Sequence, residues 1–209
     1  MKKKYMLMGV AAALITTTII GGSLAAIQVN GEDVRQDINT RSLSIELTGS
    51  GTAEGNLYLE NAMPGGVIDK DIKIENTADT PLYARVTIRK YWGDYESGSI
   101  ELTKDYSKDT DKISLEVNGE WLEDKNAGDG GETSVYYYRK PIEPGTEPVD
   151  ILKSLKLDAD LDNSYADKGI GLEVEVEAVQ TYAAQDAMLS EWGIWADIDE
   201  NGTIINIEE

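Results

Sequence analysis

Apolar and polar residues alternate in short segments along most of this chain. The clearest segment is 172–178, where apolar residues alternate with glutamates, as expected for a strand with one buried face. Turn residues such as Asn118-Gly119 separate the segments. The pattern predicts about eight strands with one apolar face each. They lie at 43–47, 68–74, 82–91, 113–117, 121–122, 135–138, 155–161 and 172–178.

Strands of this kind must bury their apolar faces against one another, so the pattern predicts an all-β fold. We expect an antiparallel two-sheet β-sandwich of jelly-roll or Greek-key type. One short C-terminal helix is also expected, because Ala184, Ala187, Met188 and Trp192 recur at helical spacing. The polar stretch 93–111 is expected to form a loop.

The first 25 residues have the layout of a secretory signal peptide. Three lysines follow Met1, an apolar run extends from Met6 to Ile20, and small residues lead to Ala25. Cleavage is expected after Ala25. The apolar run is shorter than the roughly 20 residues that span a membrane, so no stable membrane anchor is expected after cleavage.

The predicted division of the chain is a signal peptide at 1–25, an N-terminal arm at 26–41 and a β-sandwich domain at 42–209. The arm is mostly polar, with scattered apolar residues from Ile27 to Ile38. It is either a disordered terminus or a segment that adds as a strand to an open sheet edge. The sandwich domain includes the C-terminal helix and an Asp-rich loop.

The chain is strongly acidic. Removal of residues 1–25 takes away three of 19 basic residues and none of 39 acidic ones, which leaves a formal charge of −23. Nucleic acid is therefore not an expected partner, because phosphate binding needs clustered Lys and Arg.

The chain contains no cysteine and no histidine. Nucleophilic triads that use histidine, thiol catalysis and the usual ligand sets of catalytic zinc are therefore excluded. Stability has to come from a core rather than from disulfides. We expect a protein that is not an enzyme, with no catalytic residues.

The C-terminal segment from Asp197 to Glu208 matches the twelve-residue ligand spacing of a calcium-binding EF-hand loop. The sequence thus predicts calcium as a candidate cofactor. The candidate ligands are Asp197, Asp199, Asn201, Thr203 and Glu208.

The same segment also suits a β-hairpin that turns at Asn201-Gly202. In that alternative Ile198 lies opposite Ile205 and Ala196 lies opposite Ile207, which gives the hairpin one apolar face. The sequence leaves the two interpretations open.

Several stretches in a fixed order resemble one family of secreted Gram-positive proteins, the TasA and camelysin (CalY) group. The similar stretches are Asn61–Gly66 with Ile72–Asp79, Pro81–Ile88, and Val176–Gln180 followed by Ala187 and Trp192. The resemblance implies a jelly-roll domain that assembles into extracellular biofilm fibres, with itself and other matrix proteins as partners. It also implies export with a SipW-type signal peptidase and donation of an N-terminal segment to the next subunit.

The leading hypothesis is a secreted structural subunit of extracellular matrix or surface fibres that self-assembles by strand donation. The first alternative is a monomeric calcium-dependent surface binding or adhesion module. The second is a camelysin-type metallopeptidase, against which the lack of histidine counts. The expected location is extracellular, either secreted or held non-covalently at the surface of a Gram-positive cell.

Overall fold

A computed structural model describes residues 17–19, 45–49, 56–57, 63–95, 102–128 and 131–208. The predicted arm at 26–41 lies outside these ranges, as does the predicted signal peptide apart from residues 17–19. In the first three ranges the structure defines only the strand pairing of the backbone.

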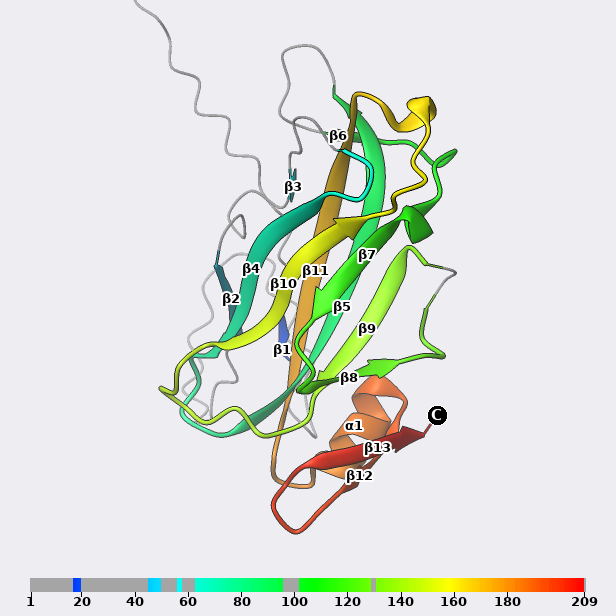
Figure 1. The fold of residues 1–209 in the computed structure, drawn as a ribbon. Coiled ribbons are helices and arrows are strands. Elements are labelled where there is room, and N and C mark those ends of the chain that lie inside the picture. The colour runs from blue at the N-terminus through cyan, green and yellow to red at the C-terminus, as the bar shows by residue number, and fades with distance from the viewer. Residues whose placement is uncertain are drawn as a thin grey trace, which may run out of the picture.

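Two sheets packed face to face form the body of the protein (Figure 1). The larger sheet has the central order β1-β11-β5-β9-β8, with β3 also paired to β11 and β6 to β5. Its strands are β1 (Thr17–Ile19), β3 (Asn56–Leu57), β5 (Leu82–Tyr95), β6 (Leu102–Lys104), β8 (Trp121–Asp124), β9 (Thr133–Tyr138) and β11 (Lys168–Gln180).

The smaller sheet has the order β2-β4-β10-β7. Its strands are β2 (Ile45–Gly49), β4 (Val67–Asn76), β7 (Ile113–Val117) and β10 (Val149–Leu157). Strands that follow one another in the chain mostly change sheets, as in β9 to β10 to β11, which is typical of Greek-key and jelly-roll sandwiches rather than of meanders. The predicted antiparallel two-sheet sandwich is confirmed, and the described strand pair that runs parallel is β1 with β11.

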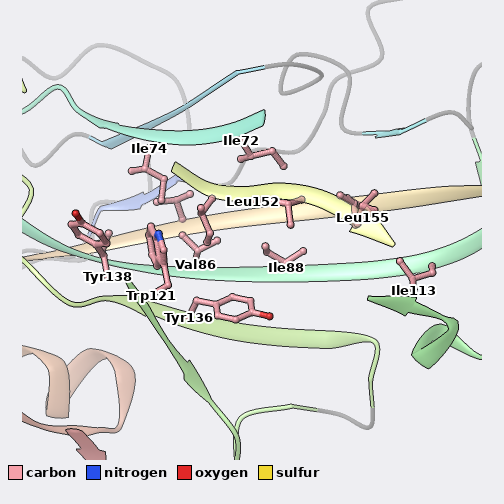
Figure 2. Close-up of a cluster of buried hydrophobic side chains, with 14 of the residues drawn as sticks. Ile72, Ile74, Val86, Ile88, Ile113, Trp121, Tyr136, Tyr138, Leu152 and Leu155 are labelled. Carbon is pink, nitrogen blue, oxygen red and sulfur yellow. The ribbon is translucent and has the colours of Figure 1, made fainter. Parts of the chain in front are cut away.

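The main core lies between the two sheets (Figure 2). Alternate residues of β5 point into it, and β11 is paired with β5 in register from end to end, so its apolar residues meet those of β5. Ile88 and Val176 are fully buried examples. The sequence alternation predicted these two strands because each of them turns alternate residues into this core.

Strand β10 differs from its prediction. We expected a strand at 155–161, but β10 spans Val149–Leu157. Irregularities in its pairing with β4 fall between Asp150 and Leu152 and between Leu152 and Ser154. Extra residues at such bulges interrupt the alternation of faces, so neighbours such as Ile151 and Leu152 are both buried. This disruption hid the first half of the strand from the sequence pattern.

The expected loop at 93–111 is only partly a loop. β5 continues to Tyr95, and β6 pairs with its end. A short 3-10 helix, η1 (Thr110–Lys112), then leads into β7. β6 has only three residues, so the stretch contains no long run of alternation.

A C-terminal unit packs on the outer face of the larger sheet, at one end of the sandwich (Figure 1). It consists of α1 (Ala184–Trp192) and a hairpin of β12 (Trp195–Ile198) and β13 (Ile204–Glu208). Ala184, Met188 and Trp192 lie on one buried stripe of α1, so the predicted helix is confirmed. Gly193 ends it with φ of 72° and donates its N–H to the Met188 carbonyl. Within the described residues, no helix is long and apolar enough to cross a membrane.

Candidate interaction edge and C-terminal loop

The outer edge of β11 is incompletely paired in the described structure. β5 pairs with the whole inner side of β11, from Lys168 to Gln180. On the outer side, β3 pairs only with Ile170 and Gly171, and β1 only with residues 176–178. The backbone of 172–175 lies between these two contacts without a partner strand among the described residues.

β1 runs parallel to β11, with Thr17 opposite Val176 and Ile19 opposite Ala178. These three residues belong to the segment that the sequence predicts to be removed after Ala25. Cleavage there would leave the edge at 176–178 vacant as well. The mature chain would then expose a row of unpaired backbone N–H and C=O groups, which is a template for another strand.

The strands at the ends of the two sheets are shorter than β11. β8 has four residues and ends in two acidic ones, Glu123 and Asp124. β7 and β2 have five residues each. Short and charged edges resist pairing with further strands. β11, with 13 residues, is the edge best suited to accept a strand.

The outward side chains of β11 are largely neutralised by the sheet itself. The guanidinium of Arg85 donates from Nε to Glu177 at 2.6 Å. Lys104 Nζ lies 3.6 Å from Glu173 and 3.2 Å from Glu132. Arg85 of β5 thus pairs with a carboxylate of the adjacent strand β11. Cross-strand pairs of opposite charge stabilise the face of a sheet and leave its edge unaffected.

The segment with the calcium-loop spacing folds as a hairpin turn. The Asp199 carboxylate Oδ1 accepts the N–H groups of Asn201 and Thr203, each at 2.8 Å. Backbone hydrogen bonds between Asp199 and Thr203 and from Gly202 to Asp199 close the turn, and Gly202 has φ of 76°. Hydrogen bonds from these backbone N–H groups lower the pKa of Asp199. The Asp199 carboxylate thus stabilises the hairpin turn.

The other predicted ligands lie along the hairpin strands. Asp197 is paired with Asn206, and Glu208 is opposite Trp195. Among the residues that the structure describes, no three acidic side chains gather as a metal ion requires. Calcium binding at this segment therefore stays a prediction.

The hairpin has nearly the register expected for it. Ala196 lies opposite Ile207, as expected, but Ile198 lies opposite Ile204 instead of Ile205. An irregularity between Asp197 and Ile198 accounts for the difference. It turns Ile204 into the core and leaves Ile205 exposed.

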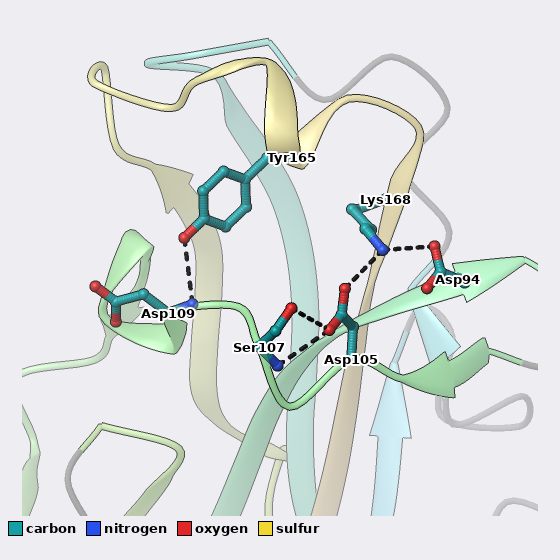
Figure 3. A network of polar contacts seen from close by, with 6 residues as sticks. All are labelled: Asp94, Asp105, Ser107, Asp109, Tyr165 and Lys168. Atoms are coloured by element: carbon teal, nitrogen blue, oxygen red, sulfur yellow. Dashed lines mark hydrogen bonds and ion pairs between the residues drawn. The ribbon is translucent and has the colours of Figure 1, made fainter.

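A polar network that the sequence did not predict fastens the start of β11 to its neighbours (Figure 3). Lys168 Nζ donates to Asp94 and to Asp105, both at 2.6 Å. Asp105 Oδ1 also accepts the hydroxyl and the N–H of Ser107. These hydrogen bonds hold the pKa of the Asp105 carboxyl far below its usual range, with the bond from Lys168 as the largest cause.

This network gives a testable pH dependence. The pKa of Asp105 is lower in the folded than in the unfolded chain, so its stabilisation is present above about pH 4 and is lost as the pH falls further. We expect Asp105→Asn to lower the free energy of unfolding at pH 7. The difference in the free energy of unfolding between this variant and the wild type should become smaller between pH 4 and pH 2.

Urea unfolding followed by circular dichroism at pH 7, 4, 3 and 2 measures this gap. Glu147→Gln is the matched control, because the Glu147 side chain is exposed and no hydrogen bond or ion pair joins it to the described residues. If the difference in unfolding free energy between Asp105→Asn and the wild type does not change with pH, the charged network is not a source of stability.

Comparison with known proteins adds little. No family model matches the chain, and no curated protein does. Among solved structures, a chain from the crystal structure of the CaDoc0917–CaCohA2 complex superposes with a TM-score of 0.28 and 10% identity. The match covers 57% of this chain and 92% of that chain. A superposition this loose supports no inference about the present protein.

Proposed function

We propose that the mature chain is a secreted structural subunit of extracellular matrix or surface fibres, and that it self-assembles by strand donation. In this proposal the N-terminal arm at 26–41 of one copy adds to the outer edge of β11 of the next copy. Each subunit then donates one strand and accepts one strand. Such a head-to-tail contact builds an open filament rather than a closed ring when its rotation does not close.

The observation that carries the proposal is the outer edge of β11, which has no partner strand among the described residues at 172–175 and would lose its partner at 176–178 if residues 1–25 are removed. An added strand gains backbone hydrogen bonds along the edge, and apolar side chains on one of its faces can extend the core. The parallel pairing of β1 with residues 176–178 supports the idea that this edge accepts a strand. The arm has the apolar residues that such a strand needs, among them Ile27 and Val29.

The remaining parts of the proposal come from the sequence. The predicted signal peptide and the resemblance to the TasA and camelysin group support export with a SipW-type peptidase from a Gram-positive cell. Other matrix proteins are proposed as additional partners. A structural role requires no catalytic residues, and we propose none.

The test uses the chain that begins at Ala26. We expect it to form fibres visible by electron microscopy and large species in size-exclusion chromatography with light scattering. Replacing the apolar arm residues Ile27, Val29, Val34 and Ile38 with serine should abolish assembly, because a donor strand without apolar side chains cannot extend the core. This variant should elute as a monomer in size-exclusion chromatography and form no fibres.

The matched control replaces the polar arm residues Gln28, Asn30 and Gln36 with serine, and it should assemble like the wild type. Equal assembly of both variants would contradict strand donation by the arm. A wild-type chain that stays monomeric without calcium and with millimolar calcium would contradict the self-assembling subunit. It would favour the monomeric surface-binding module instead.

A further inference from the structure

A buried lysine reaches from the larger sheet to the edge of the smaller one. Lys90 lies between Ile88 and Trp92 on the face of β5 that points into the core, and 8% of its surface is exposed. Its Nζ donates a hydrogen bond to the carbonyl of Ile113, the first residue of β7. Among the described residues, no carboxylate forms an ion pair with it. The side chain thus spans the gap between the two sheets and ends on the backbone of β7.

A buried amine at this position costs free energy, because burial opposes its charged form. Burial lowers the pKa of Lys90, and the nearby carboxylates of Asp111, Asp109 and Glu123 partly offset this. An apolar side chain of similar size in place of a buried charge is often neutral or stabilising. The stability of the monomer alone therefore does not account for a lysine here.

The carbonyl that Lys90 binds lies on the outer edge of β7. β7 ends the smaller sheet and has β10 on its inner side (Figure 1). The Asp158 N–H donates to the Lys112 carbonyl at 3.0 Å, so the backbone of Lys112 faces the β10 side. Successive residues of a strand turn their backbone groups to opposite sides, so the carbonyl of Ile113 faces outward. The N–H of Ile113 is bonded as well, to the Thr110 carbonyl.

The next part of β7 has the properties of an edge that can accept a strand. Leu115 and Val117 are half-buried and pack against the core between the sheets. By the same alternation the backbone of Leu115 faces outward, where β7 has no partner strand among the described residues. Two such edges that meet would bury apolar side chains and gain backbone hydrogen bonds. Natural sheets prevent this pairing with charged side chains that point inward at the edge.

We propose that Lys90 prevents the β7 edge from pairing with the β7 edge of a second copy. A strand laid along β7 would compete with Lys90 for the Ile113 carbonyl and would cover its amine. The contact that Lys90 prevents is a two-fold symmetric, antiparallel dimer. This inference goes beyond strand donation and does not require it. For the proposed fibre subunit, it would help to restrict strand addition to β11, and that consequence alone rests on the proposed function.

Lys90→Met tests the proposal in a chain that begins at Ala26 and carries serine at the four apolar arm positions, so that the proposed donor is removed. The parent with Lys90 should be a monomer in size-exclusion chromatography with light scattering. Lys90→Met should dimerise at a concentration at least roughly tenfold lower than its parent. The amides of 113–117 should gain protection from hydrogen exchange in the dimer. The thermal unfolding temperature should not fall, because methionine replaces a buried amine.

Lys153→Met is the matched control. Lys153 is exposed on β10, and the change removes the same charge and adds the same apolar side chain. This variant should stay monomeric. Lys90→Gln is a second variant that keeps a hydrogen-bond donor for Ile113 without the charge. We expect it to dimerise more weakly than Lys90→Met, and it replaces that variant if the methionine chain does not fold.

Three results would overturn the proposal. The first is a folded Lys90→Met chain that stays monomeric or that gains protection at a strand other than β7. The second is equal dimerisation of Lys153→Met. The third is failure of both Lys90 variants to fold, which would make Lys90 a residue needed for folding. None of these results bears on strand donation, because every chain in the test lacks the apolar side chains of the arm.

Discussion

Replacing Arg85 with methionine is expected to lower the free energy of unfolding by about 3 kcal/mol. Arg85 lies between three elements of the fold. Its Nε donates to Glu177 of β11 at 2.6 Å, and its Nη1 donates to the Trp192 carbonyl of α1 at 3.5 Å. Its guanidinium carbon also lies 5.4 Å from the centre of the Trp192 ring.

The expected loss of stability is large because the substitution leaves the Glu177 carboxylate without its partner. The Glu177 side chain is 12% exposed, so removing its partner leaves a largely buried carboxylate without compensation. The C-terminal end of α1 also loses a cation that interacts favourably with the helix dipole. Methionine retains most of the buried apolar volume, so the loss reports the charge rather than a cavity.

A double-mutant cycle provides the control for this prediction. Arg85→Met combined with Glu177→Leu removes both charges, and we expect it to recover most of the stability lost by Arg85→Met alone. Urea unfolding measures all four chains. A loss below about 0.5 kcal/mol for Arg85→Met, the value of a surface substitution, would contradict the idea that Arg85 joins β5 to β11 and to the C-terminal unit.

Replacing Trp92 with alanine is expected to lower the free energy of unfolding by about 3–5 kcal/mol. Trp92 has 1% of its surface exposed and belongs to the core between the sheets. Its ring lies edge-on to Tyr165, with 4.9 Å between ring centres, and its Nε1 donates to the Asp109 carbonyl at 3.0 Å. The substitution therefore opens a cavity and removes a hydrogen bond that joins the core to the loop before β7.

The chain supplies its own control for Trp92→Ala. Trp195 has 40% of its surface exposed on β12, and Trp195→Ala should cost at most about 1 kcal/mol. Both variants remove an indole, so the difference between them in urea unfolding reports burial. Equal losses would contradict the placement of Trp92 in the centre of the sandwich.

The sequence predicted the strands whose alternation is regular and failed where geometry interrupts it. Along β5 and β11 alternate apolar residues, such as Val86, Ile88 and Val176, face the core between the sheets, so period-two patterning was sufficient. Along β10 the irregular pairing places Ile151 and Leu152 in the core side by side, which no alternation rule detects. The helix was predictable because Ala184, Met188 and Trp192 keep helical spacing.

The candidate sites were harder to predict for a different reason. The same Asp, Asn and Gly residues that can ligand calcium also form tight hairpin turns. Only the folded position of Asp199, with its carboxylate bound to the turn, favours the hairpin. The partly unpaired edge of β11 depends on which segments meet in space. No local pattern specifies those contacts.

The most direct test of the proposed assembly is amide hydrogen exchange on the chain that begins at Ala26, compared between monomer and assembled material. Strand donation predicts that amides within 172–180 of β11 gain protection on assembly, while those of the edge strands β7 and β8 do not. A gain confined to β7 or β8, or none at β11, would contradict the assignment of β11 as the accepting edge.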